Sequence, residues 1–335
     1  MRDVRIVALH DMFQEKVRKK IALKVDIICY SLTEGRLLMQ KPRSIKLGDS
    51  IELMDFLNNI FRISRGCPPT MFEEYPTMYH RKNYCNLLII RDNGKIVSHV
   101  GIYPYDIVSQ NQRLKVGGIG GVSTHPDYRK KGYAAELLNF CIEKLEKENY
   151  DFSILWGNPS FYQRFGYQPS GKEYIYILNK NILNKSNFFI TKYKILLYQP
   201  EMLDEIIKFY NKTKPSRVMK SKEKWALLLS LPNRNTFVAY DKDRVVAYCT
   251  VGGSKYYEES VVDFATEEDE TVLLVLFKHI FNIFNFQQLK VYSPMKIEKL
   301  EQMGIRGQTN HLYLLRKINS NAKDISFYIA QIDHI

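Results

Sequence analysis

Residues 117–134 constrain the fold of this chain more than any other stretch, because they carry three local signals in a fixed order. Small residues and glycines come first, Pro126 then interrupts the extended pattern, and a helical apolar periodicity follows. This order predicts a strand, a tight turn and a helix. The apolar positions of the predicted helix are Ala134, Leu137, Leu138, Cys141 and Leu145.

The start of this helix is predicted to bind an anion. The first turn of a helix has backbone N–H groups without partners, and the helix dipole adds a partial positive charge there. Gly132 lets an anion approach the backbone closely. Charge-assisted hydrogen bonds of this kind are worth about 1.5–3 kcal/mol each. Three formal positive charges stand beside the turn, on Arg129, Lys130 and Lys131.

Two other phosphate motifs fit the stretch less well. Gly118 and Gly120 could begin a dinucleotide fingerprint, but its third glycine would fall at Ser123, and a proline rather than a helix follows. The Gly-Lys-Ser/Thr end of a P-loop is absent. Two interpretations without a ligand stay open, because the glycines can serve a tight bend or close strand packing and the cations can form an ordinary solvated turn.

Two motifs together carry a family resemblance. Residues 129–134 fit the pattern Arg or Gln, two residues, Gly, one residue, then Gly or Ala. A second element follows at 156–167, where Tyr162 and Gly166 match a Tyr-x-x-x-Gly-aromatic segment. The two elements resemble the coenzyme site of the GNAT N-acetyltransferase superfamily, and the resemblance covers roughly residues 40 to 175.

This resemblance implies a mixed α/β fold, acetyl-CoA as cosubstrate, and transfer of an acetyl group to a primary amine by direct attack in a ternary complex. A backbone N–H near Val122 would bind the thioester oxygen, and Tyr162 would protonate the departing thiolate. A core tyrosine with a satisfied hydroxyl is the alternative for Tyr162. The acetyl-CoA contacts that the resemblance implies fall on Val122, Ser123, Thr124, Arg129, Lys130, Lys131, Gly132, Tyr133, Ala134 and Asn158.

The general base is the least defined part of the predicted site. Many relatives place a glutamate on the strand equivalent to 114–122, and this strand has no carboxylate. Abstraction of the proton through water is therefore one expectation. In some tandem relatives the terminal carboxylate of the chain enters the active site, so that of Ile335 is a further candidate. His125 is interpreted as a turn residue, and the other candidates are Glu73, Glu74, His80, His99 and Asp106.

The composition is that of a globular protein in a reducing compartment. No apolar run of about 18 residues occurs and charges are spread through the N-terminal segment, which predicts no membrane contact and a cytoplasmic location. The 5 cysteines are far apart and form no Cys-x-x-Cys pair, so disulfides are not expected. Cys141 is predicted to be a core residue. None of the 7 histidines pairs with another at metal-ligand spacing, so no metal is predicted.

The net charge of +13 suits a polyanionic ligand such as coenzyme A. Nucleic acid is the alternative, since basic proteins gain affinity by neutralising phosphates. However, the positive charges are interspersed with 36 acidic residues, and no helix-turn-helix or zinc pattern occurs. We therefore expect no nucleic-acid function.

A chain of 335 residues predicts two domains. Residues 89–100 and 238–249 align without gaps, both as hairpins with a polar turn, which predicts two related domains in tandem. In the second copy, four carboxylates at 267–270 stand at the helix start and would repel a pyrophosphate, so this copy is predicted to be degenerate. This pairing of an active and a degenerate GNAT domain in one chain resembles the domain organisation of the enhanced-intracellular-survival acetyltransferases. Those proteins carry a further C-terminal domain, for which this chain is too short.

The predicted division of the chain follows from this pairing. Residues 1–38 are an N-terminal extension, 39–175 the acetyl-CoA-binding domain, 176–316 the degenerate domain and 317–335 a C-terminal tail. The acceptor stays open between a small-molecule amine and a protein amine, and the sequence predicts no oligomeric state. A catalytically silent acyl-CoA-binding or regulatory protein is the alternative function.

Overall fold

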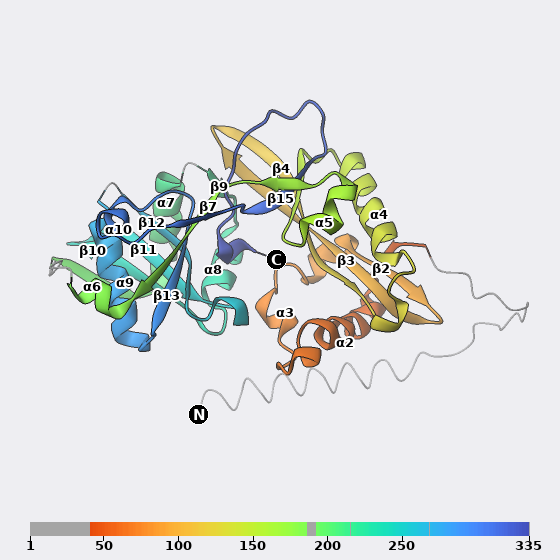
Figure 1. Cartoon of the computed structure of the whole chain (residues 1–335), viewed down its shortest axis with the longest axis horizontal. Helices are drawn as coiled ribbons and strands as arrows, with labels where there is room; N and C mark the ends of the chain where they lie inside the picture. Colours follow the sequence, from red (N-terminus) through yellow and green to blue (C-terminus); the bar gives the residue numbers. More distant parts are fainter. Residues whose placement is uncertain (1–40, 186–191, 215, 268, 335) are drawn as a thin grey trace, which may run out of the picture. The chain divides into compact units, whose positions relative to one another are not determined.

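The structure, a computed structural model, describes residues 41–185, 192–214, 216–267 and 269–334. The predicted N-terminal extension and Ile335 lie outside these ranges. The described residues form two mixed β-sheets with helices packed on them, which confirms the predicted mixed α/β fold (Figure 1).

The first sheet has the strand order β1-β2-β3-β4-β5-β15-β6, and β9 pairs with β3 off this path. Only β4 and β5 run parallel along it. Its strands are β1 (Arg43–Ser44), β2 (Leu87–Asp92), β3 (Lys95–Ser109), β4 (Gln112–Thr124), β5 (Phe152–Leu155), β6 (Gln168–Ser170), β9 (Ser216–Val218) and β15 (Tyr313–Lys317).

The second sheet has the order β14-β7-β13-β12-β11-β10-β8, again with a single parallel pair, β12 with β13. Its strands are β7 (Glu173–Asn179), β8 (Tyr193–Leu197), β10 (Arg234–Asp241), β11 (Arg244–Gly252), β12 (Ser260–Thr266), β13 (Gln288–Ser293) and β14 (Gln308–Asn310).

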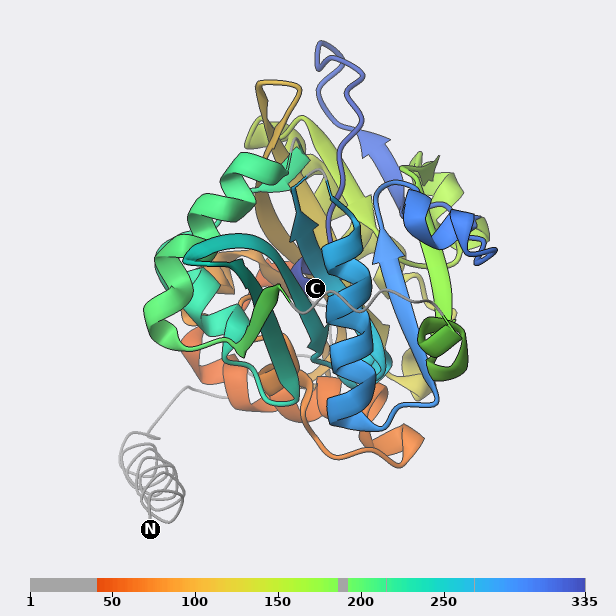
Figure 2. The same cartoon turned by 90° about the vertical axis from the view of Figure 1, so that its left-hand side faces the viewer.

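Successive side chains of a strand point to opposite faces of the sheet. In the first sheet both faces carry apolar side chains, and helices cover both. In β2, Leu87 and Ile89 pack with α2, whereas Leu88 and Ile90 pack with α4, and Cys141 of α4 is fully buried there, as predicted. Helix α9, drawn in blue, lies on the second sheet (Figure 2). The helices are α2 (Ser50–Phe61), α3 (Met71–Glu74), α4 (Tyr133–Lys147), α5 (Pro159–Tyr162), α6 (Lys180–Lys185), α7 (Leu203–Thr213), α8 (Lys222–Leu229), α9 (Thr271–Phe284) and α10 (Glu298–Gln302).

The internal repeat of the sequence is a structural repeat. The β2–β3 hairpin turns at Asn93-Gly94, which have φ of 50° and 76°, as a two-residue primed turn requires. The β10–β11 hairpin turns at the equivalent place. Each hairpin also has a register shift at the same aligned position, between Ile90 and Arg91 in the first and between Ala239 and Tyr240 in the second.

The two sheets exchange one strand each. Strand β7 follows β6 in sequence, yet it pairs with β13 and β14 of the second sheet. Strand β15 comes at the end of the second half, yet it lies between β5 and β6 of the first sheet. The predicted division points at 175/176 and 316/317 fall inside these two strands.

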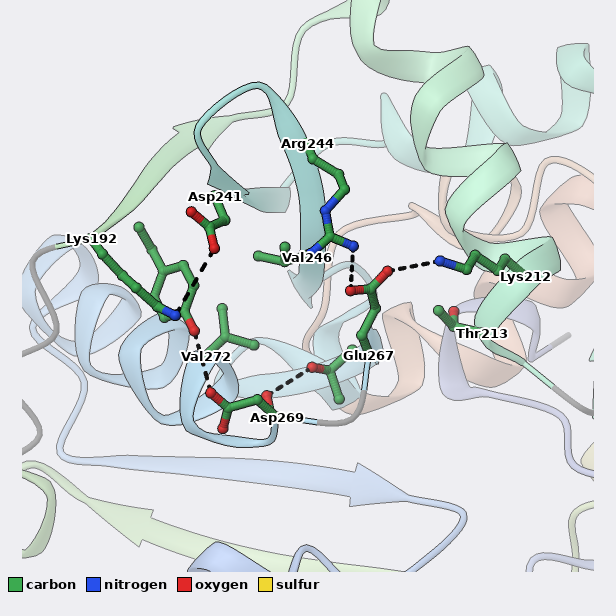
Figure 3. Close-up of a pocket in the computed structure, with 11 residues that line it drawn as sticks. Lys192, Lys212, Thr213, Asp241, Arg244, Val246, Glu267, Asp269 and Val272 are labelled. Carbon is green, nitrogen blue, oxygen red and sulfur yellow. Dashed lines mark hydrogen bonds and ion pairs between the residues drawn. The ribbon is translucent and has the colours of Figure 1, made fainter.

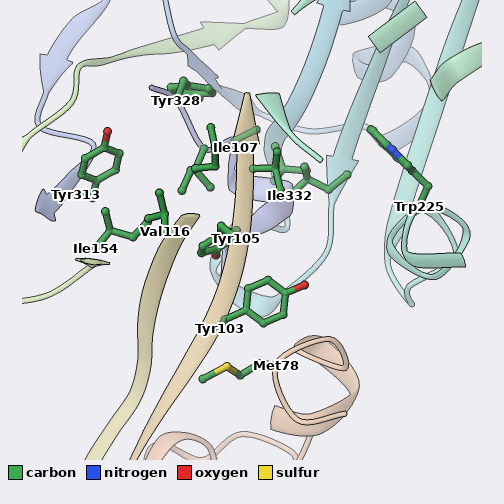
Figure 4. Packing of buried hydrophobic residues seen from close by; sticks show 14 of the residues in the cluster. Met78, Tyr103, Tyr105, Ile107, Val116, Ile154, Trp225, Tyr313, Tyr328 and Ile332 are labelled. Atoms are coloured by element: carbon green, nitrogen blue, oxygen red, sulfur yellow. The ribbon is translucent and has the colours of Figure 1, made fainter. Parts of the chain in front are cut away.

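The chain after β15 is part of the core. Residues 325–332 carry six buried apolar side chains that belong to the same hydrophobic cluster as β3, β4 and α8. Ile332 and Tyr328 lie beside Tyr105 and Ile107 of β3 (Figure 4). This segment, residues 325–334, is called the C-terminal segment below.

Candidate functional site

Strand β4 leaves its parallel neighbour at the glycine-rich stretch. Pairing with β5 ends at Ile119, opposite Leu155. Pairing with β3 continues to Thr124, but its register shifts between His99 and Gly101. Gly121 has φ of +63° in this bulge, a conformation that glycine adopts without strain. Beyond Ile119 the edge of β4 therefore has backbone groups that β5 does not bond, as a ligand between the two strands requires.

The N-terminus of α4 is open to an anion. Gly132 is its N-cap, with φ of 89°, and offers no side chain to bond the N–H groups of the first turn. A Cβ at Gly132 would meet nothing within 4 Å. Arg129, Lys130 and Lys131 are exposed, and within the described ranges no carboxylate forms an ion pair with them. The arrangement predicted for 129–134 is thus present as a local structure.

Several of the predicted coenzyme contacts have structural partners as well. The Ser123 hydroxyl is buried and donates to the Gly121 carbonyl at 2.9 Å, so it supports the bulge. The Tyr133 hydroxyl donates to Asp92 at 2.8 Å and fixes α4 to the β2–β3 hairpin. Asn158 caps α5 by accepting from the Ser160 N–H at 3.1 Å. Val122, Thr124 and Ala134 are half-buried along the same strand and turn.

Tyr162 ends α5 and belongs to the hydrophobic cluster that includes Ile119 of β4 and Leu155 of β5, the last pair before these strands separate. Gly157 lets its ring approach the backbone, because a Cβ there would come within 2.4 Å of the ring. Burial raises the pKa of Tyr162 to about 12, so the phenol keeps its proton at neutral pH. The side chain is thus a neutral hydrogen-bond donor, as protonation of a thiolate requires.

The candidate bases occupy different environments. Asp106 is bound by Arg113, with Oδ1 2.7 Å from Nε, and Glu74 by Arg62 at 2.7 Å. His80 and Glu73 are exposed, and His80 Nδ1 accepts from the Lys82 N–H at 3.1 Å. His125 accepts from the Asp127 N–H at 3.3 Å, as a turn residue does.

His99 is the candidate nearest to the bulge of β4. Its Nδ1 lies 3.0 Å from the Leu88 carbonyl, and its buried Nε2 has no partner among the described residues. A Cβ at Gly121 would lie 3.1 Å from Nε2 and 2.7 Å from the Tyr79 hydroxyl, so both groups face the bulge. Burial lowers the pKa of His99 to about 3. The ring is therefore neutral and a weak base.

The C-terminal segment reaches the end of β5. The His334 ring centroid lies 3.9 Å from that of Trp156, which directly follows β5. His334 Nδ1 is 3.0 Å from the Tyr257 hydroxyl, and burial lowers the pKa of His334 to about 3. Sequence reasoning proposed only the terminal carboxylate here and missed Asp333 and His334. The apolar run at 325–332 was the available signal that the segment is buried.

At the equivalent place in the second half, carboxylates bond the helix start and the nearby cations. The loop between β12 and α9 borders an open cavity of about 670 Å³ (Figure 3). Asp269 Oδ1 accepts from the Thr271 N–H at 2.9 Å and so caps α9. Glu267 holds the two nearby cations, with Lys212 at 2.9 Å and Arg244 at 2.6 Å. These bonds lower the pKa of Glu267, so the groups that could bind a phosphate are already occupied by an anion of the chain.

The parallel strands β4 and β5 thus separate beside a helix N-terminus that is open to an anion, as the resemblance to the GNAT superfamily predicts. Residues 41–170 match the family model described as acetyltransferase (GNAT) domain. This part of the chain is therefore similar to a GNAT acetyltransferase domain.

Similar proteins agree with this assignment. The uncharacterized N-acetyltransferase YhbS of Escherichia coli is 27% identical over 82 residues, 24% of this chain. The chain spans about half the length of that curated relative, 48%. A probable N-acyltransferase from Enterococcus faecalis has a similar fold, with a TM-score of 0.67, 15% identity, and 84% of this chain and 73% of that chain covered. Eis1 from Mycobacterium abscessus superposes with a TM-score of 0.58, 14% identity, and 83% and 74% covered.

Within the described residues, no cluster of three or more His, Cys, Asp or Glu side chains is arranged to hold a metal ion. In the same residues, no helix combines the length and the apolar character that crossing a bilayer needs.

Proposed function

We propose that this chain is an N-acetyltransferase that transfers the acetyl group of acetyl-CoA to a primary amine by direct attack in a ternary complex. The observation that carries the proposal is the N-terminus of α4, uncapped by any side chain and flanked by Arg129, Lys130 and Lys131, beside the separated strands β4 and β5. The pyrophosphate would bind at the α4 turn, and the thioester would lie along β4 near Val122. Holding the thioester against the amine supplies much of the rate.

Two residues would act on the reacting groups. Tyr162 would protonate the departing thiolate, which its protonated hydroxyl and its place beside Gly157 support. The terminal carboxylate of Ile335 would accept the proton of the amine, either directly or through water. This role is supported by the burial of the C-terminal segment and by the contact of His334 with Trp156, although Ile335 itself lies outside the described residues.

We further propose that the second half binds no coenzyme. Asp269 accepts a hydrogen bond from the first N–H group of α9, and Glu267 neutralises Lys212 and Arg244. The acceptor is proposed to be a small-molecule or protein amine. The thiols of Cys85, Cys141 and Cys249 form no disulfide, which supports a reducing, cytoplasmic compartment.

One experiment tests the proposed activity. Purified full chain is mixed with acetyl-CoA and a panel of polyamines, aminoglycosides, amino acids and lysine peptides, and thiol release is followed. We expect release above the rate without amine for at least one class. Tight CoA binding without release for any amine would favour the alternative of a silent acyl-CoA-binding protein, which the pairing of Asp106 and Glu74 with arginines would suit.

A further inference from the structure

A buried ion pair ties the C-terminal segment to the second half of the chain. Lys220 lies between β9 and α8, and Asp333 lies next to His334. Lys220 Nζ is 2.6 Å from Asp333 Oδ2, although the two residues are 113 positions apart in the sequence. Their side chains are 0% and 1% exposed, so the pair has no access to water.

The surroundings fix both members of the pair. Lys220 Nζ lies 4.2 Å from the ring centroid of Trp225 and 4.6 Å from that of Tyr210. The Tyr105 hydroxyl of β3 donates to the backbone carbonyl of Asp333 at 2.7 Å. The pair therefore joins three parts of the molecule at one point: the first sheet, the second half and the C-terminal segment.

Stability alone is a poor reason for such a pair. The free energy needed to remove two charges from water offsets much of the free energy of their attraction. Apolar side chains of similar volume can therefore often replace a buried ion pair without loss of stability. A buried charge pair differs from apolar packing because each charge needs its one partner, so the pair can specify a single arrangement of the segments that it joins. The geometry fixed here is that of Asp333, directly before the residue that contacts Trp156.

We propose that Lys220 is a positioning residue for acetyl transfer, because its ion pair with Asp333 holds the C-terminal segment against Trp156 at the end of β5. The inference rests on the proposed function. Lys220 acts through Asp333 and His334 and contacts no ligand itself. Its loss changes the place of the C-terminal segment beside the β4–β5 gap and leaves the coenzyme site at the α4 turn intact.

The test compares single and double apolar variants. Lys220→Met or Asp333→Leu alone leaves one charge buried without its partner, so each is expected to lose thermal stability. The double variant removes both charges and is expected to recover most of that stability and to bind CoA as the wild type does. Its kcat is expected to fall by about 100-fold, the scale of effect of a displaced reacting group. Hydrogen exchange of 328–334 is expected to accelerate.

A matched control and a substitute variant accompany the test. Lys222→Met removes a lysine of the same region whose partner, Asp204, lies 2.7 Å away in an exposed pair, and it is expected to leave kcat unchanged. If the double variant does not fold, Asp333→Asn replaces it, because the amide keeps the size of the side chain and the bond from Tyr105 goes to the unchanged backbone carbonyl. The same fall in kcat is expected.

The outcomes separate this inference from the proposed function. A folded double variant, or Asp333→Asn, with wild-type kcat and unchanged exchange at 328–334 would show that the pair is only structural and would overturn the inference. A wild-type chain that acetylates no amine would refute the proposed function, and with it the positioning role of Lys220. Loss of kcat with CoA affinity unchanged supports both.

Discussion

Gly132→Glu is expected to abolish CoA binding while the chain stays folded. The substitution places a carboxylate at the open N-cap of α4, where a Cβ meets nothing within 4 Å and the bulk would extend into the space of the pyrophosphate. Losing two charge-assisted hydrogen bonds of about 1.5 kcal/mol each corresponds to a fall in affinity of at least about 100-fold. Calorimetric titration with CoA measures this, and circular dichroism checks the fold.

Gly132→Ala is the matched control. Gly132 has φ of 89°, and any side chain there costs about 1–2 kcal/mol in the left-handed region. Alanine shares this strain but adds neither charge nor reach, so we expect most of the affinity to survive. A folded Gly132→Glu chain that binds CoA like the alanine variant would place the coenzyme elsewhere.

Tyr162→Phe is expected to lower turnover by about 100-fold to 10,000-fold, or about 3–5 kcal/mol of barrier, with little change in acetyl-CoA affinity. Phenylalanine keeps the ring that packs on Gly157 and next to Phe161 and Tyr167, and it removes only the hydroxyl. Thiol release with an accepted amine gives kcat, and calorimetry gives the affinity.

One control variant keeps this result specific. Tyr167→Phe removes a buried hydroxyl between α5 and β6, 2.7 Å from the Ser153 hydroxyl, and should cost stability more than turnover. Full turnover in Tyr162→Phe would mean that water protonates the thiolate and that Tyr162 is a packing residue.

Local signals made much of the fold predictable. The Asn93-Gly94 turn fixed one hairpin, and Pro126 with the following apolar periodicity fixed the start of α4. The repeat at 89–100 and 238–249 predicted two hairpins that share even their register shifts. The exchange of β7 and β15 could not be predicted from local patterns. Which sheet a strand joins is decided by packing between segments that are distant in the sequence.

In the candidate site, too, local features were predictable from the sequence and long-range contacts were not. The anion turn is a single continuous segment, so its residues follow from a motif. His99, Asp333 and His334 come to the site from other parts of the chain, and their roles depend on contacts such as that of Lys220 with Asp333, 113 positions away. The helix start at 267–270 is the exception, because its acidic character was evident from the sequence, and in the structure Asp269 bonds the first turn of α9 while Glu267 pairs with Arg244.

The most direct test of the central claim is a crystal structure of the full chain grown with saturating CoA. We predict one CoA per chain, with its pyrophosphate within about 2.7–3.2 Å of backbone N–H groups at the α4 turn and its thiol between β4 and β5 near Tyr162. The cavity at Glu267 and Asp269 should hold no coenzyme. Coenzyme at the start of α9, or none at α4 under saturating conditions, would contradict the assignment.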